Sequence, residues 1–193
     1  MRLYLVRHGQ TNNNHKRLIQ GRVDAPLNLT GKKQAKTAGQ TLKSLKVDFD
    51  KIVSSPLSRA LETGYLVGRK INYKDNILLN ENLIERDFGN YEMTLIADSF
   101  PKIMTEGFTE EFYEDDETMI NRVKKGIDEL YYTLKDKNVI VACHAHVIRS
   151  MYIIHDNEKY NFTNFFLGNG SIHEFDYDGT NLELINTYLN DEE

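Results

Sequence analysis

The chain has 193 residues, of which 40% are hydrophobic and 27% charged, and its formal net charge is −5 at pH 7. These values are ordinary for a globular domain with a core of its own. The acidic balance argues against a nucleic-acid partner, which needs a basic face, and a single cysteine excludes an internal disulfide and a zinc site made of cysteines.

The location of the protein is predicted from the same data. No apolar stretch approaches the ~20 residues that span a membrane. The N-terminal residues MRLYLV enter a strand-like pattern without the apolar region and cleavage site of a signal peptide. We therefore expect a cytoplasmic protein with no membrane partner. The acidic clusters at residues 110–111, 114–117 and 191–193 are predicted to be solvated surface.

The N-terminal part of the chain alternates between strand and helix patterns. Residues 3–6 form a short apolar run that is typical of a buried strand. Thr30 is predicted to cap a helix whose apolar positions recur at helical spacing. Residues 50–54 predict a second strand, and Pro56 suits the first turn of a helix that runs to about Val67.

The middle of the chain is less regular. Residues 77–79 predict a weak strand, and residues 80–107 lack a clean period, so we expect loops and short helices there. Residues 117–134 predict a strong amphipathic helix.

The C-terminal part contains a buried strand at residues 138–143, a helix at 147–154, and a hairpin of residues 171–177 and 182–188 with Asp178-Gly179 as its turn. Strands that alternate with helices favour a mostly parallel sheet covered on both faces, which is a three-layer α/β/α sandwich. With no repeat and no linker, residues 1–193 are predicted to form a single domain.

Unusual residues follow three of the predicted strands. Arg7-His8-Gly9 follows the first, residues 54–59 with Arg59 follow the second, and Cys143-His144-Ala145-His146 follows the strand at 138–143. Ligands bind at the carboxyl ends of strands in such folds. Two arginines suit a tetrahedral oxyanion, and a histidine among cations stays neutral and nucleophilic. Gly9 is expected to let the backbone approach the ligand closely.

The order of these motifs resembles the histidine phosphatase superfamily, which includes the cofactor-dependent phosphoglycerate mutases and many small phosphatases. The resemblance covers nearly the whole chain. It rests on "LVRHGQT" (5–11), "QGRVDAPLNLTGKKQA" (20–35), "SSPLSRALET" (54–63), "LIERDFGNYE" (83–92), "ETMINRV" (117–123), "CHAHVIR" (143–149) and "NGSI" (169–172). The implied fold is phosphoglycerate mutase-like.

The resemblance also implies roles for individual residues. His8 would be the nucleophile that becomes phosphohistidine, and Arg7, Arg59 and His144 would line the phosphate pocket. Glu85 falls where the family keeps its proton donor.

Other positions of the family match substrate contacts. Asn14 matches a contact to the phosphoryl group, and Gln20 and Gly21 match a loop that touches the substrate. The resemblance implies no metal and no cofactor.

Two departures from the family pattern stand near these motifs. Met93 occupies a position where many relatives have glycine, which can change the loop but removes no catalytic group. Ala145 and His146 follow the second histidine, where many relatives have glycine. His146 can reach the pocket or face the protein, and the second interpretation is favoured because His-x-His alone is a weak signal.

A competing pattern lies in the same stretch. "CHAHVIRS" (143–150) has the Cys-x5-Arg-Ser spacing of cysteine-dependent phosphatases. Their loop of backbone amides usually needs glycine, and this one has none. Cys143 is therefore predicted to be a packed residue at the end of a strand.

The substrate is predicted to be a small phosphorylated metabolite, and the reaction hydrolysis of a phosphomonoester. Arg86 matches an arginine of the mutases, but residues 98–117 hold one lysine, no arginine and eight acidic residues, so mutase activity is the alternative. A non-catalytic protein that binds a phosphorylated ligand is a further alternative, against which the presence of His8 and Glu85 argues. The sequence is silent on the oligomeric state.

Overall fold

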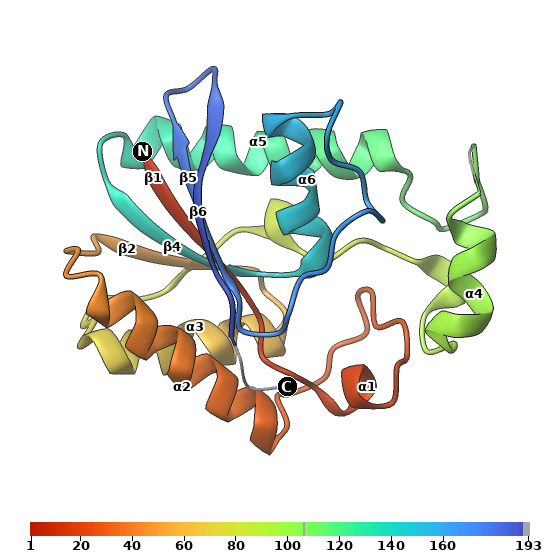
Figure 1. Cartoon of the computed structure of the whole chain (residues 1–193), viewed down its shortest axis with the longest axis horizontal. Helices are drawn as coiled ribbons and strands as arrows, with labels where there is room; N and C mark the ends of the chain where they lie inside the picture. The colour runs from red at the N-terminus through yellow and green to blue at the C-terminus, as the bar shows by residue number, and fades with distance from the viewer. Residues whose placement is uncertain (106, 191–193) are drawn as a thin grey trace.

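A computed structural model of the chain describes residues 1–105 and 107–190, and within this part six strands form one sheet (Figure 1). The order across the sheet is β3-β2-β4-β1-β5-β6. The strands are β1 (Arg2–Arg7), β2 (Lys51–Ser54), β3 (Leu78–Leu79), β4 (Asn138–Cys143), β5 (Ile172–Tyr177) and β6 (Leu182–Tyr188).

Strand direction confirms the mostly parallel sheet. β1, β2, β3 and β4 run parallel to one another, and β5 is antiparallel to both β1 and β6. In the register of the sheet, Arg7 lies beside Cys143 and Ser54 beside Ala142. The residues that follow β1, β2 and β4 therefore come out at the same edge.

Helices cover both faces of the sheet, which confirms the three-layer sandwich (Figure 1). They are α1 (Asn12–His15), α2 (Leu29–Ser44), α3 (Ser58–Ile71), α4 (Ile96–Ile103), α5 (Asp116–Leu134) and α6 (Ala145–His155), with short 3-10 turns η1 (Glu81–Leu83) and η2 (Gly89–Tyr91). α2 and α3 lie on one face, and α5 and α6 on the other.

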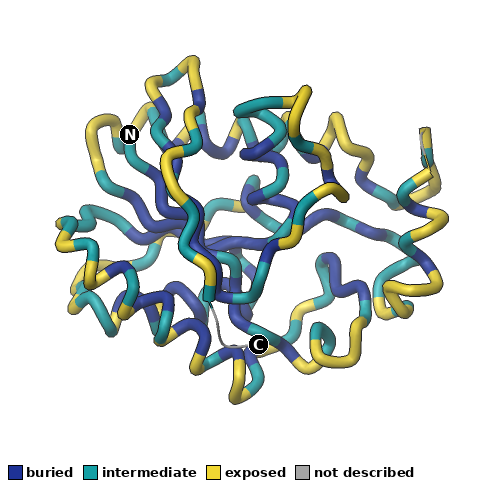
Figure 2. The backbone as a smooth tube through the Cα atoms, viewed as in Figure 1, coloured by how far each residue is buried: buried dark blue, intermediate teal, exposed yellow. Residues whose placement is uncertain are grey.

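Alternation along the strands divides the core between these two faces. Leu3 and Leu5 of β1 pack in the cluster under α5 and α6, whereas Tyr4 and Val6 pack in the cluster under α2 and α3. Figure 2 shows this burial along the central strands, with the exposed residues at the outer surfaces of the helices and in the loops. Among the described residues, none of the helices combines the length and apolar character needed to cross a membrane.

Two helix starts differ from the sequence prediction. The N-cap of α2 is Asn28, whose side chain accepts from the Gly31 N–H at 2.8 Å, so the prediction of Thr30 was wrong. The Asn28 N–H donates to the Gln10 carbonyl, and this bond holds residue 28 in the extended conformation that a cap requires. Pro56 lies before α3, not in its first turn, since α3 begins at Ser58.

The end of α3 and the burial of one acidic residue also differ from the sequence prediction. α3 runs to Ile71 instead of Val67, and Asn72 ends it in the left-handed conformation. Residues 110–111 and 115–117 are exposed as predicted, but Glu114 is buried. Its carboxylate accepts from Arg122 Nε at 2.7 Å, and this ion pair compensates its burial. The cluster at 191–193 lies outside the described residues.

The segment between β3 and α5 packs as a third, smaller cluster. Its buried members are Ile19, Phe88 and Ile103, so the segment is joined to the loop after α1. As expected, it consists of loops and short helices. In Figure 1 α4 stands apart from the sheet, on the side that carries α1.

Candidate active site

A cavity of about 300 Å³ opens beyond the carboxyl ends of the parallel strands. All but one of the residues predicted for the site line this cavity. Those that line it are Arg7, His8, Asn14, Gln20, Gly21, Arg59 and Glu85. The exception is His144, whose ring lies against that of His8 with 5.2 Å between centroids. The structure therefore brings the predicted site residues together.

The hydrogen bonds of His8 define which ring nitrogen can react. His8 follows β1 directly, and its backbone N–H donates to the Cys143 carbonyl of the neighbouring strand at 2.9 Å. Its Nδ1 lies 2.8 Å from the Gly9 carbonyl, which can only accept, so Nδ1 carries the proton and Nε2 keeps a lone pair. Burial, followed by the charge of Arg59, holds the pKa of His8 well below its ordinary value. The ring is therefore neutral at pH 7.

Gly9 allows close packing against α2, which the sequence analysis did not foresee. A Cβ at Gly9 would stand 2.2 Å from the carbonyl oxygen of Gly31 in the first turn of α2. Only glycine lets the loop after β1 lie so close to this helix.

Two arginines and His144 supply polar nitrogen atoms beside His8. Arg7 donates to the Leu167 carbonyl. Arg59 is fully buried and donates to the carbonyls of Val23 and Gly21 at 2.9 and 2.6 Å.

Two buried nitrogens of this group have no hydrogen-bond partner among the described residues. They are Nε of Arg59 and Nδ1 of His144, whose Nε2 lies 2.7 Å from Ser55 Oγ. Unpaired buried polar atoms are costly, and an oxyanion ligand is one way to offset that cost.

Glu85 is held at the cavity by two backbone amides. Its Oε1 accepts from the N–H of Arg86 at 2.9 Å and from the N–H of His146, in the first turn of α6, at 3.2 Å. Burial raises the pKa of the carboxyl, but the contact with His146 and the hydrogen bond from the Arg86 N–H outweigh it, so the net pKa lies well below its usual range. Glu85 is therefore a carboxylate at pH 7.

His146 is buried and also lines the cavity, so the interpretation that it only faces the protein was incomplete. Its ring stacks on Phe162 with centroids 5.5 Å apart and meets Phe88 edge to face at 5.1 Å. Its Nδ1 is 3.8 Å from Glu85 Oε1. Burial lowers the pKa of His146 to about 4, and the ring is therefore neutral at pH 7.

The three predicted substrate contacts come from the loop between β1 and α2. Asn14 and Thr11 cap α1 reciprocally, and the Gln20 side-chain oxygen accepts from the Thr11 hydroxyl at 2.9 Å. Gly21 has φ +50, and a Cβ there would stand 1.9 Å from the Glu92 carboxylate, so glycine is required.

Two residues at the site were missed by the sequence analysis. Asn169 donates from Nδ2 to the His8 carbonyl at 2.9 Å, and only its place in "NGSI" before β5 pointed to it. Arg149 lines the cavity from α6. Met93, which replaces the glycine of many relatives, adopts a left-handed φ of 64° that glycine would adopt without strain.

Cys143 has no access to the cavity that would suit a nucleophile. Its side chain packs in the core under α5 and α6, and it does not line the cavity. Burial, aided by the Glu85 charge, raises the pKa of the thiol far above its ordinary value. The thiolate that a cysteine mechanism needs does not form at neutral pH.

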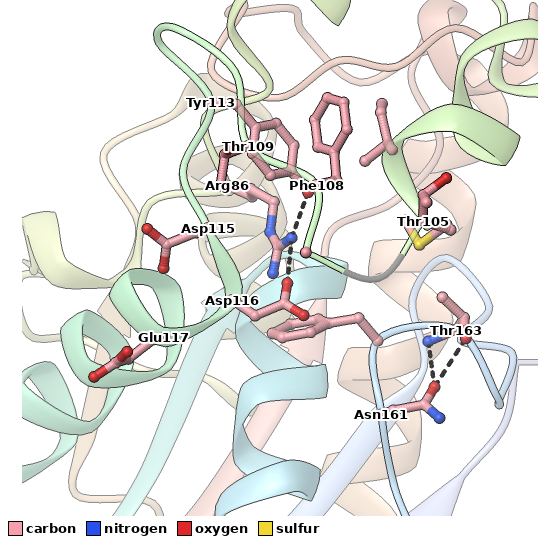
Figure 3. A pocket seen from close by; sticks show the side chains of 14 residues that line it. Arg86, Thr105, Phe108, Thr109, Tyr113, Asp115, Asp116, Glu117, Asn161 and Thr163 are labelled. Carbon is pink, nitrogen blue, oxygen red and sulfur yellow. Dashed lines mark hydrogen bonds and ion pairs between the residues drawn. The ribbon is translucent and has the colours of Figure 1, made fainter.

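A second cavity, of about 740 Å³, is lined by Arg86, which follows Glu85 in the chain (Figure 3). Arg86 lies over the Phe162 ring at 4.1 Å, and its Nη1 donates to the Tyr113 hydroxyl and the Asp116 carboxylate, each at 2.7 Å. Arg86 thus lines this second cavity and not the one that holds His8. No group of three or more His, Cys, Asp or Glu side chains within residues 1–105 and 107–190 is placed to hold a metal ion.

Comparison with known proteins gives a family match. The family described as "Histidine phosphatase superfamily (branch 1)" matches residues 3–189. A probable phosphatase of Schizosaccharomyces pombe is 34% identical, with 84% of this chain and 77% of that protein covered.

Solved structures agree over nearly the whole chain. The phosphoserine phosphatase of Entamoeba histolytica, in complex with 3-phosphoglyceric acid, has a TM-score of 0.79 and 25% identity over 99% of this chain and 98% of that one. A phosphoglycerate mutase of Bacillus anthracis has a TM-score of 0.82 and 24% identity over 96% and 91%. The fold is therefore phosphoglycerate mutase-like.

Proposed function

The chain belongs to the histidine phosphatase superfamily, and from this premise we propose that it hydrolyses small phosphomonoesters through a phosphohistidine on His8. The observation that carries the proposal is the state of the His8 ring. Nδ1 is bonded to the Gly9 carbonyl, the ring is neutral at pH 7, and His8 shares the cavity with Arg7 and Arg59.

The first step forms the phosphohistidine. His8 Nε2 attacks phosphorus, the ester P–O bond breaks, and Glu85 gives a proton to the leaving alkoxide. Arg7, Arg59 and His144 face the charge that spreads over the equatorial oxygens of the transition state.

The second step releases inorganic phosphate. Water attacks phosphorus, the Glu85 carboxylate takes its proton, and the P–Nε2 bond breaks. Glu85 is ionised at pH 7 in the free protein, but a bound phosphate repels its charge and raises its pKa. The proton that Glu85 donates therefore arrives with the monoanionic ester, whose second pKa is about 6.

One contact favours hydrolysis over the mutase alternative. Arg86, which matches a mutase arginine, is bound to Tyr113 and Asp116 and does not line the cavity with His8. We also propose that residues 1–193 form one cytoplasmic domain and that the substrate is a small phosphorylated metabolite.

Substitution of the nucleophile tests the proposal. His8→Ala should abolish hydrolysis of an aryl phosphate, whereas His15→Ala, which changes an exposed histidine of α1, should leave the rate unchanged. Quenching turnover in base should trap an acid-labile, base-stable phosphoprotein in the wild type only. A His8→Ala variant with the wild-type rate would refute the mechanism.

A further inference from the structure

Apart from the predicted site residues, His146 and Arg149, the lining of the active-site cavity is apolar. Most of this apolar wall comes from three separate segments: the loop after α1, one side of α4, and the loop that precedes β5. Their side chains in the cavity are Leu18, Ile19, Ile96, Phe100, Phe166 and Leu167. These segments lie far apart in the sequence and meet around this cavity.

Two of these side chains are exposed at the cavity. Phe166 is 74% and Ile96 38% exposed, although both line the cavity. Apolar surface left in water is unfavourable, and a ligand with an apolar part would cover it. These side chains are therefore placed to contact a ligand that extends outward from His8.

Several polar groups next to this wall are bonded within the protein, whereas the buried Nε of Arg149 and Nε2 of His146 have no partner among the described residues. The Gln20 side-chain oxygen accepts from Thr11, and Asn14 is engaged in capping α1. Arg149 donates from Nη2 to the Phe165 carbonyl at 2.9 Å and lies over the ring of the same residue. Among the described residues that line the cavity there is no lysine. Apart from the Arg149 and His146 nitrogens, this wall offers few groups for several hydroxyls or a second anionic group.

We propose that the alcohol half of the substrate is apolar, an alkyl or aryl group that packs against Ile96, Phe100 and Phe166 while its phosphate lies at His8. This inference rests on the proposed phosphatase function, because it assigns the part of the substrate that leaves. Sugar phosphates and phosphoglycerate would place hydroxyls or a carboxylate against the same apolar wall. These polar groups would lose their hydrogen bonds to water, which disfavours binding.

A series of n-alkyl phosphates tests the proposal without changing the chemistry. Ethyl, propyl, butyl and hexyl phosphate have leaving groups of nearly equal basicity, so differences in kcat/KM report contacts of the chain. Each methylene that the wall covers should raise kcat/KM about fourfold. Propyl phosphate should exceed glycerol 1-phosphate, which carries two hydroxyls on the same three carbons, by roughly tenfold or more.

Variants of the wall locate the effect. Phe166→Ser and Ile96→Ser should each reduce the increase in kcat/KM that every added methylene gives. The control Tyr132→Ser changes a 91% exposed aromatic residue of α5 that lies outside the cavity, and it should keep the wild-type gain.

The outcomes separate the two proposals. Hydrolysis that depends on His8 but is flat along the series, or that favours glycerol 1-phosphate, overturns the apolar substrate and leaves the phosphatase function standing. A protein that hydrolyses none of these esters in a His8-dependent way overturns the proposed function itself.

Discussion

Replacing Glu85 with glutamine removes the proposed proton donor with little change of shape. Oε1 accepts hydrogen bonds from the N–H groups of Arg86 and His146, and the amide oxygen of glutamine can accept both. The side chain should keep its place, so the effect on the rate measures proton transfer. General acid catalysis contributes ~10²–10⁴-fold, and kcat/KM for an alkyl phosphate should fall by this factor. Nitrophenyl phosphate, whose leaving group needs little protonation, should lose roughly tenfold or less.

The pH profile gives an independent view of the same group. The pKa of Glu85 is lowered by its surroundings, so the free protein holds a carboxylate at neutral pH. The proton must enter with the ester monoanion, and kcat/KM for an alkyl phosphate should fall as the pH rises through about 6. Glu85→Gln should abolish this basic limb, because no group remains to receive that proton.

Rates of phosphohistidine formation under single turnover isolate the first step. Glu81→Gln, which changes an exposed carboxylate of η1 outside the cavity, should behave as the wild type. Equal slowing of alkyl and nitrophenyl phosphates by Glu85→Gln would refute the acid role and leave Glu85 a positioning residue. Glu92 is a poor substitute, because its carboxylate already accepts from the N–H groups of Arg22 and Val23.

Three further outcomes follow from the structure. Cys143→Ala should keep kcat near the wild-type value, since the protonated thiol lies outside the cavity, and near-total loss in a folded variant would favour a cysteine nucleophile. Prolonged treatment with a chelator should leave the rate of phosphate release unchanged, and reversible loss would contradict catalysis by His8 without a metal. Burial lowers the pKa of His146 to about 4 and of His173 to about 3, so the unfolded chain binds more protons below pH 6.5 and stability falls as the pH falls. Each histidine should remove about 2 kcal/mol between pH 6.5 and pH 5 in urea unfolding, and His173→Gln should reduce this loss; equal stabilities at both pH values would contradict it.

The parts of the site that follow strands could be predicted from the sequence. Parallel strands end at one edge, so Arg7, His8 and His144 had to lie near one another once their strands were recognised. Glu85 could be found only through its motif, because residues 80–107 have no period that fixes the direction of a side chain. Its hydrogen bond with the N–H of His146 joins residues that are 61 positions apart in the sequence. Whether this bond forms depends on how α6 packs against the loop that holds Glu85.

The apolar wall lies beyond the reach of sequence patterns for a different reason. In the sequence, Ile96 and Phe166 look like ordinary core residues. No local pattern distinguishes an apolar side chain that packs in the core from one that lines a cavity. The same limit applied to Gly9, whose close contact with Gly31 no local pattern indicates. Both the apolar wall and the role of Gly9 depend on contacts between segments that are far apart in the sequence.

The electrostatics around His8 connect nucleophilicity with the choice of ligand. Burial and the charges of Arg59 and Arg7 keep the ring neutral, but the same charges draw electron density from Nε2 and weaken it as a nucleophile. A bound phosphate neutralises these cations and removes that handicap at the moment it arrives. An uncharged ester would occupy the cavity without this compensation, and His8 would remain a poor nucleophile toward it. The arginines therefore select for an anionic phosphoryl group twice, once in binding it and once in restoring the reactivity of the histidine that attacks it.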